Sequence, residues 1–443
     1  MKSMKRFEPN WDSLKTHRVP SWYDQAKIGV LIHWGLYSVP AFAPPVGELG
    51  TIPDDEWFVA NPYAEWYFNS VNVGRGPTWE HHQKTYGSSF RYEQFADLWK
   101  AENWRPDRWA ELFRRAGARY VVLTAKHHDG FCLFPSRYTD YNALRHGPGR
   151  DVVGELTRSV REQGMRMGLY YSGIIDWCFH PEPIFNDRDV RQCNCPTGEY
   201  ADYAYHQVME LIDRYHPSVL WNDIGWPYAG EHMLPHLLAH YYNTCPEGVV
   251  NDRFNGLFYD YTTKEYHQGE MNRKGKWENV RGLGLSFGYN TQEDSRHILS
   301  SQALVRELVA TASNGGNLLI NVGPMADGTV PPIQEKSLLG MGKWLSCNGE
   351  AIYNSERCNM QPMTEGNCRV SFTQKGEDLY IIVDSEGPGQ ILLTSIRTEG
   401  ESLTQISHVR RRIEEQGLVI TVEKELDCPV VLKALGAAQD SRR

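Results

Sequence analysis

Polar and aromatic residues follow directly after several apolar runs of this chain. These runs end in His33-Trp34, Lys126-His127-His128-Asp129, Tyr170-Tyr171, Trp221-Asn222-Asp223 and Asn251-Asp252-Arg253. If the runs are strands of a parallel barrel, their carboxyl ends share the face where active sites form. Neutral imidazole offers one hydrogen-bond donor and one acceptor, which suits a hydroxyl group. Together with the indole and phenol rings, these residues predict a site for a neutral, hydroxyl-rich ligand such as a sugar.

Carboxyl groups close to these residues could cleave a sugar. Hydrolysis of a glycosidic bond uses two of them, one ionised and one protonated. Asp223, at the end of an apolar run, is placed for the ionised role. The protonated partner could be Glu265, Glu270 or Glu278, or else Glu65, and spacing alone does not choose among them.

Structural explanations compete at each position. An Asp that follows a strand is a common helix N-cap, and His33 could be an ordinary core histidine. His127, His128 and Asp129 suggest a metal site, but adjacent residues of a strand point to opposite faces, so the two histidines should not reach one ion. We therefore predict no metal and no cofactor, and we expect Asp129 to lie in a turn.

Apolar runs alternate with amphipathic stretches over the first 350 residues. Such runs predict buried parallel strands, here at Ile28–His33, Tyr120–Ala125, Met165–Tyr171, Ser218–Trp221, Gly248–Asn251, Leu283–Tyr289 and Gly316–Val322. A helix capped by Asp107, with Trp109, Leu112 and Phe113 on one face, exemplifies the stretches between them. No Gly-x-Gly-x-x-Gly follows the first run, which counts against a dinucleotide fold. We predict an α/β fold, an irregular (β/α)8-like (TIM-type) barrel, as the catalytic domain over residues 1–355.

The pattern changes after residue 355. Short alternating runs at Cys368–Thr373, Leu379–Asp384, Gln390–Thr394, Leu418–Val422 and Val430–Leu432 are separated by Gly, Asp, Glu and Pro. This pattern is typical of antiparallel strands. We therefore predict a C-terminal antiparallel β-sandwich over residues 356–443.

Composition limits the partners of the protein. The 443 residues are 41% hydrophobic and 23% charged, with a formal net charge of −9, which predicts a soluble protein that binds neither nucleic acid nor an anionic membrane. Residues 28–47 carry no charge, but their Gly and Pro residues would break a membrane helix. The first twelve residues lack an apolar segment of signal-peptide length, which predicts a cytoplasmic protein, although a secreted or periplasmic protein trimmed of its signal would look the same. A homo-oligomer is compatible with the sequence.

The chain resembles the α-L-fucosidases of glycoside hydrolase family 29. The first strand and its continuation, KIGVLIHWGLYSVP from Lys27 to Pro40, match that family's first-strand motif. Further matches follow in family order at Ala64–Tyr67, Tyr120–Phe131, Gly168–Gly173, Leu220–Pro227, Asn251–Arg253, Leu285–Asn290, Gly315–Pro324 and Asp327-Gly328. The resemblance spans about residues 7–355.

The resemblance implies a role for each candidate residue. Asp223 matches the family's nucleophile, and Glu265, in Thr263-Lys264-Glu265-Tyr266, matches the acid/base of similar members. His33, His127, His128, Glu65 and Trp66 would bind the sugar hydroxyls, Arg253 would lie beside the catalytic pair, and Tyr170, Trp221 and Phe287 would line a slot for the C6 methyl group of fucose. Relatives often have an aromatic residue where this chain has Leu31, which would widen that slot.

These roles imply a retaining exo-α-L-fucosidase that acts on fucosylated glycans or glycosides. Glu265 must be protonated while Asp223 is ionised, so we expect Glu265 in the drier setting and Asp223 among hydrogen-bond donors. An exo-hydrolase for α-L-galactosides or another related sugar is an alternative. A non-catalytic fucose-binding protein on the same scaffold is another, and such a protein need not keep both carboxylates.

Overall fold

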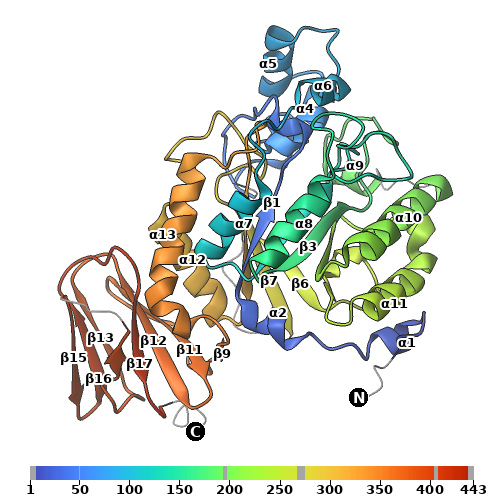
Figure 1. Cartoon of the computed structure of the whole chain (residues 1–443). Coiled ribbons are helices and arrows are strands. Elements are labelled where there is room, and N and C mark those ends of the chain that lie inside the picture. Colours follow the sequence, from blue (N-terminus) through green and yellow to red (C-terminus); the bar gives the residue numbers. More distant parts are fainter. Residues whose placement is uncertain (1–5, 49, 193–196, 267–274, 404–407, 438–443) are drawn as a thin grey trace.

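Eight parallel strands form a nearly closed barrel (Figure 1). The structure is a computed structural model that describes residues 6–48, 50–192, 197–266, 275–403 and 408–437. The barrel strands are β1 (Ile28–Ile32), β2 (Tyr120–Lys126), β3 (Arg166–Ser172), β4 (Val219–Asp223), β5 (Val249–Val250), β6 (Tyr261–Glu265), β7 (Lys276–Gly282) and β8 (Asn317–Val322). They pair in the order β5-β4-β3-β2-β1-β8-β7-β6, and a single bridge between Asn251 and Tyr261 links the two ends.

Helices surround this barrel (Figure 1). The longer ones are α7 (Pro106–Arg115), α8 (Val152–Glu162), α10 (Gly198–Tyr215), α11 (Leu234–Thr244), α12 (Ser301–Ser313) and α13 (Pro332–Asn348). Short ones are α1 (Trp11–Leu14), α2 (Ser21–Ala26), α3 (Asp54–Trp57), α4 (Tyr67–Asn72), α5 (Pro77–Thr85), α6 (Phe95–Leu98) and α9 (Asp187–Gln192). All residues of β1, β2, β4, β5 and β8 are buried, as expected for parallel strands covered on both faces. The predicted fold class is thereby confirmed.

Helix α7 shows how the sequence sets an element. The sequence predicted Asp107 as the N-cap, but the helix begins one residue earlier, with Pro106 at its first position and Arg105 as the N-cap. The fixed φ of proline suits the first position of a helix. Trp109, Leu112 and Phe113 are buried along one face, as predicted. Gly117, with φ of 96°, follows the helix and turns the chain toward β2.

The sequence prediction is wrong for the strands before β8. Residues 283–289 form a loop, and the strand lies just upstream as β7, while β6 was not predicted at all. Strand β7 reads Lys-Trp-Glu-Asn-Val-Arg-Gly, and its polar residues have partners both inside the barrel and on the surrounding helix α12, where Asn279 donates to Thr311 at 3.2 Å. Glu278, for example, accepts hydrogen bonds from Tyr120 Oη (2.6 Å), Tyr23 Oη (2.8 Å) and Trp221 Nε1 (2.9 Å). A strand that buries polar groups in this way has no apolar run to reveal it.

The C-terminal part forms two antiparallel sheets (Figure 1). Its strands are β9 (Glu356–Arg357), β10 (Met363–Glu365), β11 (Cys368–Lys375), β12 (Asp378–Ser385), β13 (Gly389–Leu393), β14 (Glu401–Ser402), β15 (Val409–Glu414), β16 (Gly417–Val422) and β17 (Val430–Ala434). One sheet has the order β10-β11-β12-β17-β14, with β9 beside β11, and the other has the order β13-β16-β15. Their shared apolar core confirms the predicted sandwich. The predicted division at residue 355 falls just before β9.

The sandwich packs against two barrel helices. Arg306 of α12 forms an ion pair with Asp384 of β12 at 2.7 Å and donates to the carbonyl of Leu426 at 3.0 Å. Trp344 Nε1 of α13 donates to the carbonyl of Pro429 at 2.7 Å. Within the described part of the chain, no helix is both long and apolar enough to span a bilayer.

Candidate active site

A cavity of about 210 Å³ opens at the carboxyl ends of the barrel strands. The residues that line it are Leu31, His33, Phe58, Tyr63, Glu65, Trp66, His127, His128, Tyr170, Val190, Trp221, Asp223, Ile224, Glu265, Val280 and Phe287. Every predicted site residue except Arg253 is among them, and Arg253 contacts two of them, Asp223 and Glu265. The sequence did not single out Phe58, Tyr63, Val190, Ile224 or Val280. Most of these are apolar residues of loops or strand ends, which carry no signal of a site in a single sequence.

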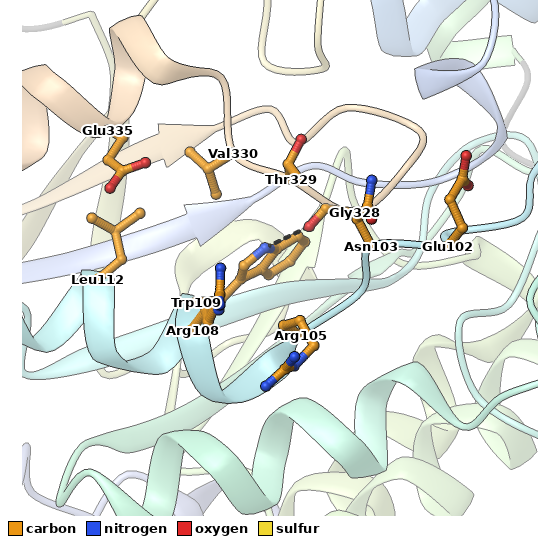
Figure 2. A pocket seen from close by; sticks show the side chains of 10 residues that line it. All are labelled: Glu102, Asn103, Arg105, Arg108, Trp109, Leu112, Gly328, Thr329, Val330 and Glu335. Atoms are coloured by element: carbon orange, nitrogen blue, oxygen red, sulfur yellow. Dashed lines mark hydrogen bonds between the residues drawn. The ribbon is translucent and has the colours of Figure 1, made fainter.

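A second hollow, shown in Figure 2, is lined by other residues than the cavity at the strand ends. It has a volume of about 490 Å³ and lies between α7 and the segment 328–335. The buried Trp109 donates to the carbonyl of Gly328 at 2.9 Å there, and Arg105 pairs with the neighbouring Asp107. None of the predicted site residues lines this hollow, so the smaller cavity is the candidate active site.

Asp223 is the last residue of β4 and is surrounded by donors. Its Oδ1 accepts from Arg253 Nη1 (2.5 Å) and from the backbone N–H of Ile224 (2.9 Å), and its Oδ2 accepts from Tyr170 Oη (2.6 Å). Burial raises the pKa of this carboxyl, but Arg253, His128 and the Tyr170 hydroxyl together outweigh burial and hold the pKa below its usual value. Asp223 is therefore a carboxylate at neutral pH, and not a helix cap.

Glu265 is the last residue of β6 and faces Asp223 across one guanidinium. Arg253, from the 3-10 helix η5 (Asp252–Phe254), donates to Glu265 Oε1 at 2.5 Å through Nη2 while its Nη1 bonds Asp223. The side chain of Glu265 is 21% exposed and that of Asp223 11%. The expectation that Glu265 has the drier setting is wrong, because β6 ends at the rim of the cavity whereas β4 is covered on both sides.

Left-handed backbone follows both carboxylates. Ile224 has φ of 63° and Tyr266 has φ of 50°. Positive φ is uncommon in non-glycine residues and is a marked outlier for a β-branched one. Such strain persists only where the surrounding structure enforces it and is concentrated at functional sites. Here it occurs directly after each of the two strands that end in a candidate catalytic carboxylate.

Three histidines line the cavity in the neutral form. Burial lowers the pKa of His33 to about 4, with partial compensation by Asn321 and Asp223, and that of His128 to about 3. Burial also lowers the pKa of His127 well below its usual value. The expectation that His127 and His128 point to opposite faces is wrong, because β2 ends at Lys126 and the two rings lie 4.0 Å apart beyond it.

The other candidate glutamates have separate places. Glu65, in the 3-10 helix η2 (Ala64–Trp66), is buried in the cavity wall and accepts from the N–H of Gly288 (2.8 Å) and from Ser286 Oγ (3.2 Å). Burial raises the pKa of Glu65 to about 7. Glu278 lies beneath the cavity in the barrel interior, and burial raises its pKa. Glu270 lies outside the described residues.

Aromatic rings form the apolar wall. Tyr170 and Trp221 are stacked at 5.2 Å, and Phe287 packs against His33 (5.1 Å) and Tyr63 (5.3 Å). Trp66 packs edge-on against His128 at 5.3 Å. These faces, together with neutral imidazoles, suit a ligand that has both hydroxyl groups and an apolar side.

Asp129 points away from the cavity. Its Oδ1 accepts from the N–H of Phe131 (3.1 Å) and its Oδ2 from Tyr92 Oη (2.8 Å), within the turn that the sequence predicted. It therefore does not join His127 and His128. Among the described residues, no three His, Cys, Asp or Glu side chains are grouped as metal ligands.

Two carboxyl groups that face one cavity of a barrel are the arrangement that glycoside hydrolases use. The family model for α-L-fucosidase matches residues 1–350. An α-L-fucosidase of Branchiostoma floridae is 36% identical over 403 residues, covering 88% of this chain and 84% of the relative, and the plasma α-L-fucosidase of Homo sapiens is 36% identical over 380 residues, covering 81% and 74%. The chain belongs to the α-L-fucosidase family.

Solved structures agree with this assignment. The α-fucosidase of Thermotoga maritima in complex with a mechanism-based inhibitor is 47% identical, with a TM-score of 0.87, and the match covers 97% of this chain and all of the other. The same enzyme in complex with fucose is 46% identical, with a TM-score of 0.88 and the same coverage.

Proposed function

We propose that the protein is a retaining exo-α-L-fucosidase that releases terminal α-L-fucosyl residues from glycans or glycosides. The observation that carries this proposal is the bridge of Arg253 between Asp223 and Glu265 at the mouth of a cavity lined by neutral histidines. Retaining enzymes need two carboxyl groups about 5–5.5 Å apart, and one planar guanidinium that bonds both keeps them close. The family assignment supports fucose as the sugar.

The chemistry proceeds in two displacements. Asp223 Oδ attacks the anomeric carbon while protonated Glu265 gives its proton to the departing glycosidic oxygen, so that a fucosyl-aspartate and a free alcohol form. Water then attacks the same carbon, Glu265 takes its proton, and the aspartate ester bond breaks to regenerate Asp223. Tyr170 and Arg253, which bond Asp223 before the reaction, hold it in the attacking orientation.

Sugar recognition follows from the remaining lining residues. His33, His127, His128, Glu65 and the Trp66 indole supply hydrogen-bonding groups, and Tyr170, Trp221 and Phe287 supply the apolar wall for the C6 methyl group. The cavity volume lies below the range of about 300–1,000 Å³ that is usual for larger ligands, which favours a single terminal sugar and hence exo-cleavage.

A panel of p-nitrophenyl glycosides tests this function. We expect release of p-nitrophenol from the α-L-fucoside, no effect of EDTA, and slower turnover of the α-L-galactoside, because the apolar wall disfavours a 6-hydroxyl group. A methyl slot provides only about 10–200-fold selectivity, so weak α-L-galactosidase activity is compatible with the proposal. Faster hydrolysis of the galactoside would contradict it. Binding of fucose without hydrolysis of any fucoside, including fucosylated oligosaccharides, would indicate a binding protein.

A further inference from the structure

The hydrogen-bonding direction of His33 is fixed by its partner Asn321. His33 Nδ1 lies 2.6 Å from Asn321 Oδ1, and Asn321 Nδ2 donates to the carbonyl of Phe287 at 2.6 Å. A carbonyl oxygen can only accept, so the amide nitrogen must face Phe287 and the amide oxygen must face His33. That oxygen also only accepts, and His33 Nδ1 therefore carries the proton. In the neutral ring, Nε2 then has a lone pair and no proton.

Ser172 fixes His128 by the same logic. His128 Nδ1 lies 2.6 Å from Ser172 Oγ, and Ser172 Oγ donates its only proton to the carbonyl of Ile175 at 2.6 Å. The hydroxyl oxygen can then only accept from the ring, so His128 Nδ1 carries the proton. His128 Nε2 lies 3.9 Å from Asp223 Oδ2, which is another acceptor. Neither of these two atoms carries a proton, so they cannot bond each other, and Asp223 Oδ2 already accepts from Tyr170 Oη. The lone pair of His128 Nε2 is therefore available to a donor on the ligand.

We infer that Asn321 and Ser172 are positioning residues that make His33 and His128 obligatory hydrogen-bond acceptors, so that the sugar must present two donating hydroxyl groups to them. This inference rests on the proposed function, because it adds the direction of the hydrogen bonds to a sugar site. It predicts rejection of sugars in which either hydroxyl is replaced by a group that accepts but cannot donate, such as an ether or fluorine.

His127 lacks such a constraint. Its Nδ1 is buried and has no hydrogen-bond partner among the described residues, and its ring is stacked on Tyr170 at 5.7 Å. Either nitrogen of His127 can therefore carry the proton. The site thus combines two fixed acceptors with one imidazole that can donate to the oxygen of a hydroxyl whose proton is already engaged.

Nitrogen-15 NMR of the full-length, histidine-labelled protein near pH 7 tests the proton positions directly. Long-range proton–nitrogen spectra separate the two neutral tautomers, and spectra of His33→Asn and His128→Asn assign the signals. We expect both rings to carry the proton on Nδ1. A proton on Nε2 of either ring would overturn the inference. No sugar is present, so this result is independent of the proposed function.

Sugar analogues test the consequence. Inhibition of p-nitrophenyl α-L-fucoside hydrolysis is measured with L-fucose and with its deoxy and deoxyfluoro analogues at C2, C3 and C4. At two of these positions we expect fluorine to weaken inhibition as much as hydrogen does, by roughly 10–100-fold, because a buried acceptor is left unpaired. Fluoro analogues that inhibit as well as fucose at every position would overturn the inference. Failure of fucose itself to inhibit would instead contradict the proposed function.

Variants of Ser172 and Asn321, with matched controls, test whether these residues set the proton positions on His128 and His33. Ser172→Ala should allow either nitrogen of His128 alone to carry the proton, and Asn321→Ser should do the same for His33 alone. Each variant should therefore change the ratio of inhibition by the deoxyfluoro and the deoxy analogue at a single carbon of the sugar ring. Ser337→Ala and Asn317→Ser are the controls. Ser337 and Asn317 are also buried and donate to backbone carbonyls, at 2.6 and 2.8 Å, but they touch neither histidine. Unchanged tautomers in both Ser172→Ala and Asn321→Ser would show that these residues do not set them.

Discussion

Asp223 and Glu265 share one cation but have different surroundings. Asp223 has three donors on its oxygens, whereas Glu265 is at the exposed rim and bonds only Arg253 among the described residues. A leaving group can therefore reach Glu265 without displacing the donors that hold Asp223. In the proposed mechanism, this difference in position, and not a drier environment around Glu265, supports Asp223 as the nucleophile and Glu265 as the acid/base.

Replacement of Glu265 should reveal its role through the leaving group. We expect Glu265→Ala to slow hydrolysis of fucosylated oligosaccharides by roughly 10²–10⁴-fold, because these alcohols need a proton to depart. An aryl fucoside with a good leaving group needs little protonation, so its first step should be much less affected. Rates of fucosyl transfer from both substrate types measure the difference. Equal losses on both would point to another acid, such as Glu65.

Glu65 should make the free energy of unfolding depend on pH. Burial raises its folded-state pKa to about 7 from an unfolded value near 4.5, so its contribution to stability is complete below pH 4.5 and is lost as the pH rises through 7. Glu65→Gln removes this loss. The free energy of unfolding of the variant, relative to the parent, should rise by on the order of 3 kcal/mol between these limits. Denaturant titrations at a series of pH values measure it.

A matched control separates burial from charge in that experiment. Glu80 of α5 is exposed, and Glu80→Gln is the control that makes the same chemical change outside the protein interior. A difference between Glu65→Gln and the parent that stays constant with pH would contradict the raised pKa of Glu65.

Strands β1 to β4 and β8 are the best predicted elements of the barrel. β1 to β4 and β8 are apolar on both faces, so continuous runs reveal them and place His33, Tyr170 and Asp223 at one face. β6 and β7 carry charged or amide side chains whose partners lie in the barrel interior, on helix α12 or at the cavity. No local pattern distinguishes such strands from loops, and Glu265 could be chosen only by resemblance.

The turn after β2 is the element that brings His127 and His128 together. Gly130, with φ of 73°, donates to the carbonyl of His127 at 3.1 Å, and Trp177 N–H donates to the carbonyl of His128 at 2.8 Å. A Cβ on Gly130 would lie 2.6 Å from Asp176 Oδ1 and 2.9 Å from Cys178 Sγ. The turn therefore requires glycine for both its backbone and its surroundings.

Gly130→Ala should consequently reduce stability and kcat/KM together. Gly164→Ala is the control, because Gly164 has φ of 75° and nothing within 4 Å of a built Cβ. We expect Gly164→Ala to cost about 1–2 kcal/mol from backbone strain alone and to leave kcat/KM unchanged. Gly130→Ala should cost more and displace the two histidines. Equal thermal shifts with unchanged kinetics would show that the turn does not position them.

At the scale of the whole molecule, the sandwich contacts the barrel through α12 and α13, away from the strand ends that carry the cavity (Figure 1). The alternating pattern predicted β11, β12, β13, β16 and β17 but missed the short strands β9, β10 and β14. It also missed β15, because Val409–Glu414 contains three arginines. The contacts between the sandwich and the barrel join residues far apart in sequence, so no local sequence pattern predicts them.

Arg306→Ala tests whether this contact is structural. The substitution removes the ion pair with Asp384 and the bond to Leu426, and we expect a loss of about 1–3 kcal/mol in the free energy of unfolding with unchanged kcat/KM. Arg296→Ala, which removes an exposed pair with Asp294, should have a smaller effect, because water and salt screen an exposed ion pair. A large drop in kcat/KM for Arg306→Ala would instead connect the sandwich to the active site.

If Asp223 forms a covalent bond with fucose, as proposed, then azide should rescue the activity of Asp223→Gly. The variant should lose nearly all turnover of p-nitrophenyl α-L-fucoside, because no group remains to attack the anomeric carbon. Added azide should restore p-nitrophenol release and yield β-L-fucosyl azide, since the small anion can occupy the space of the missing carboxylate. A variant that keeps its activity without azide, or a rescued product of α configuration, would show that Asp223 is not the nucleophile.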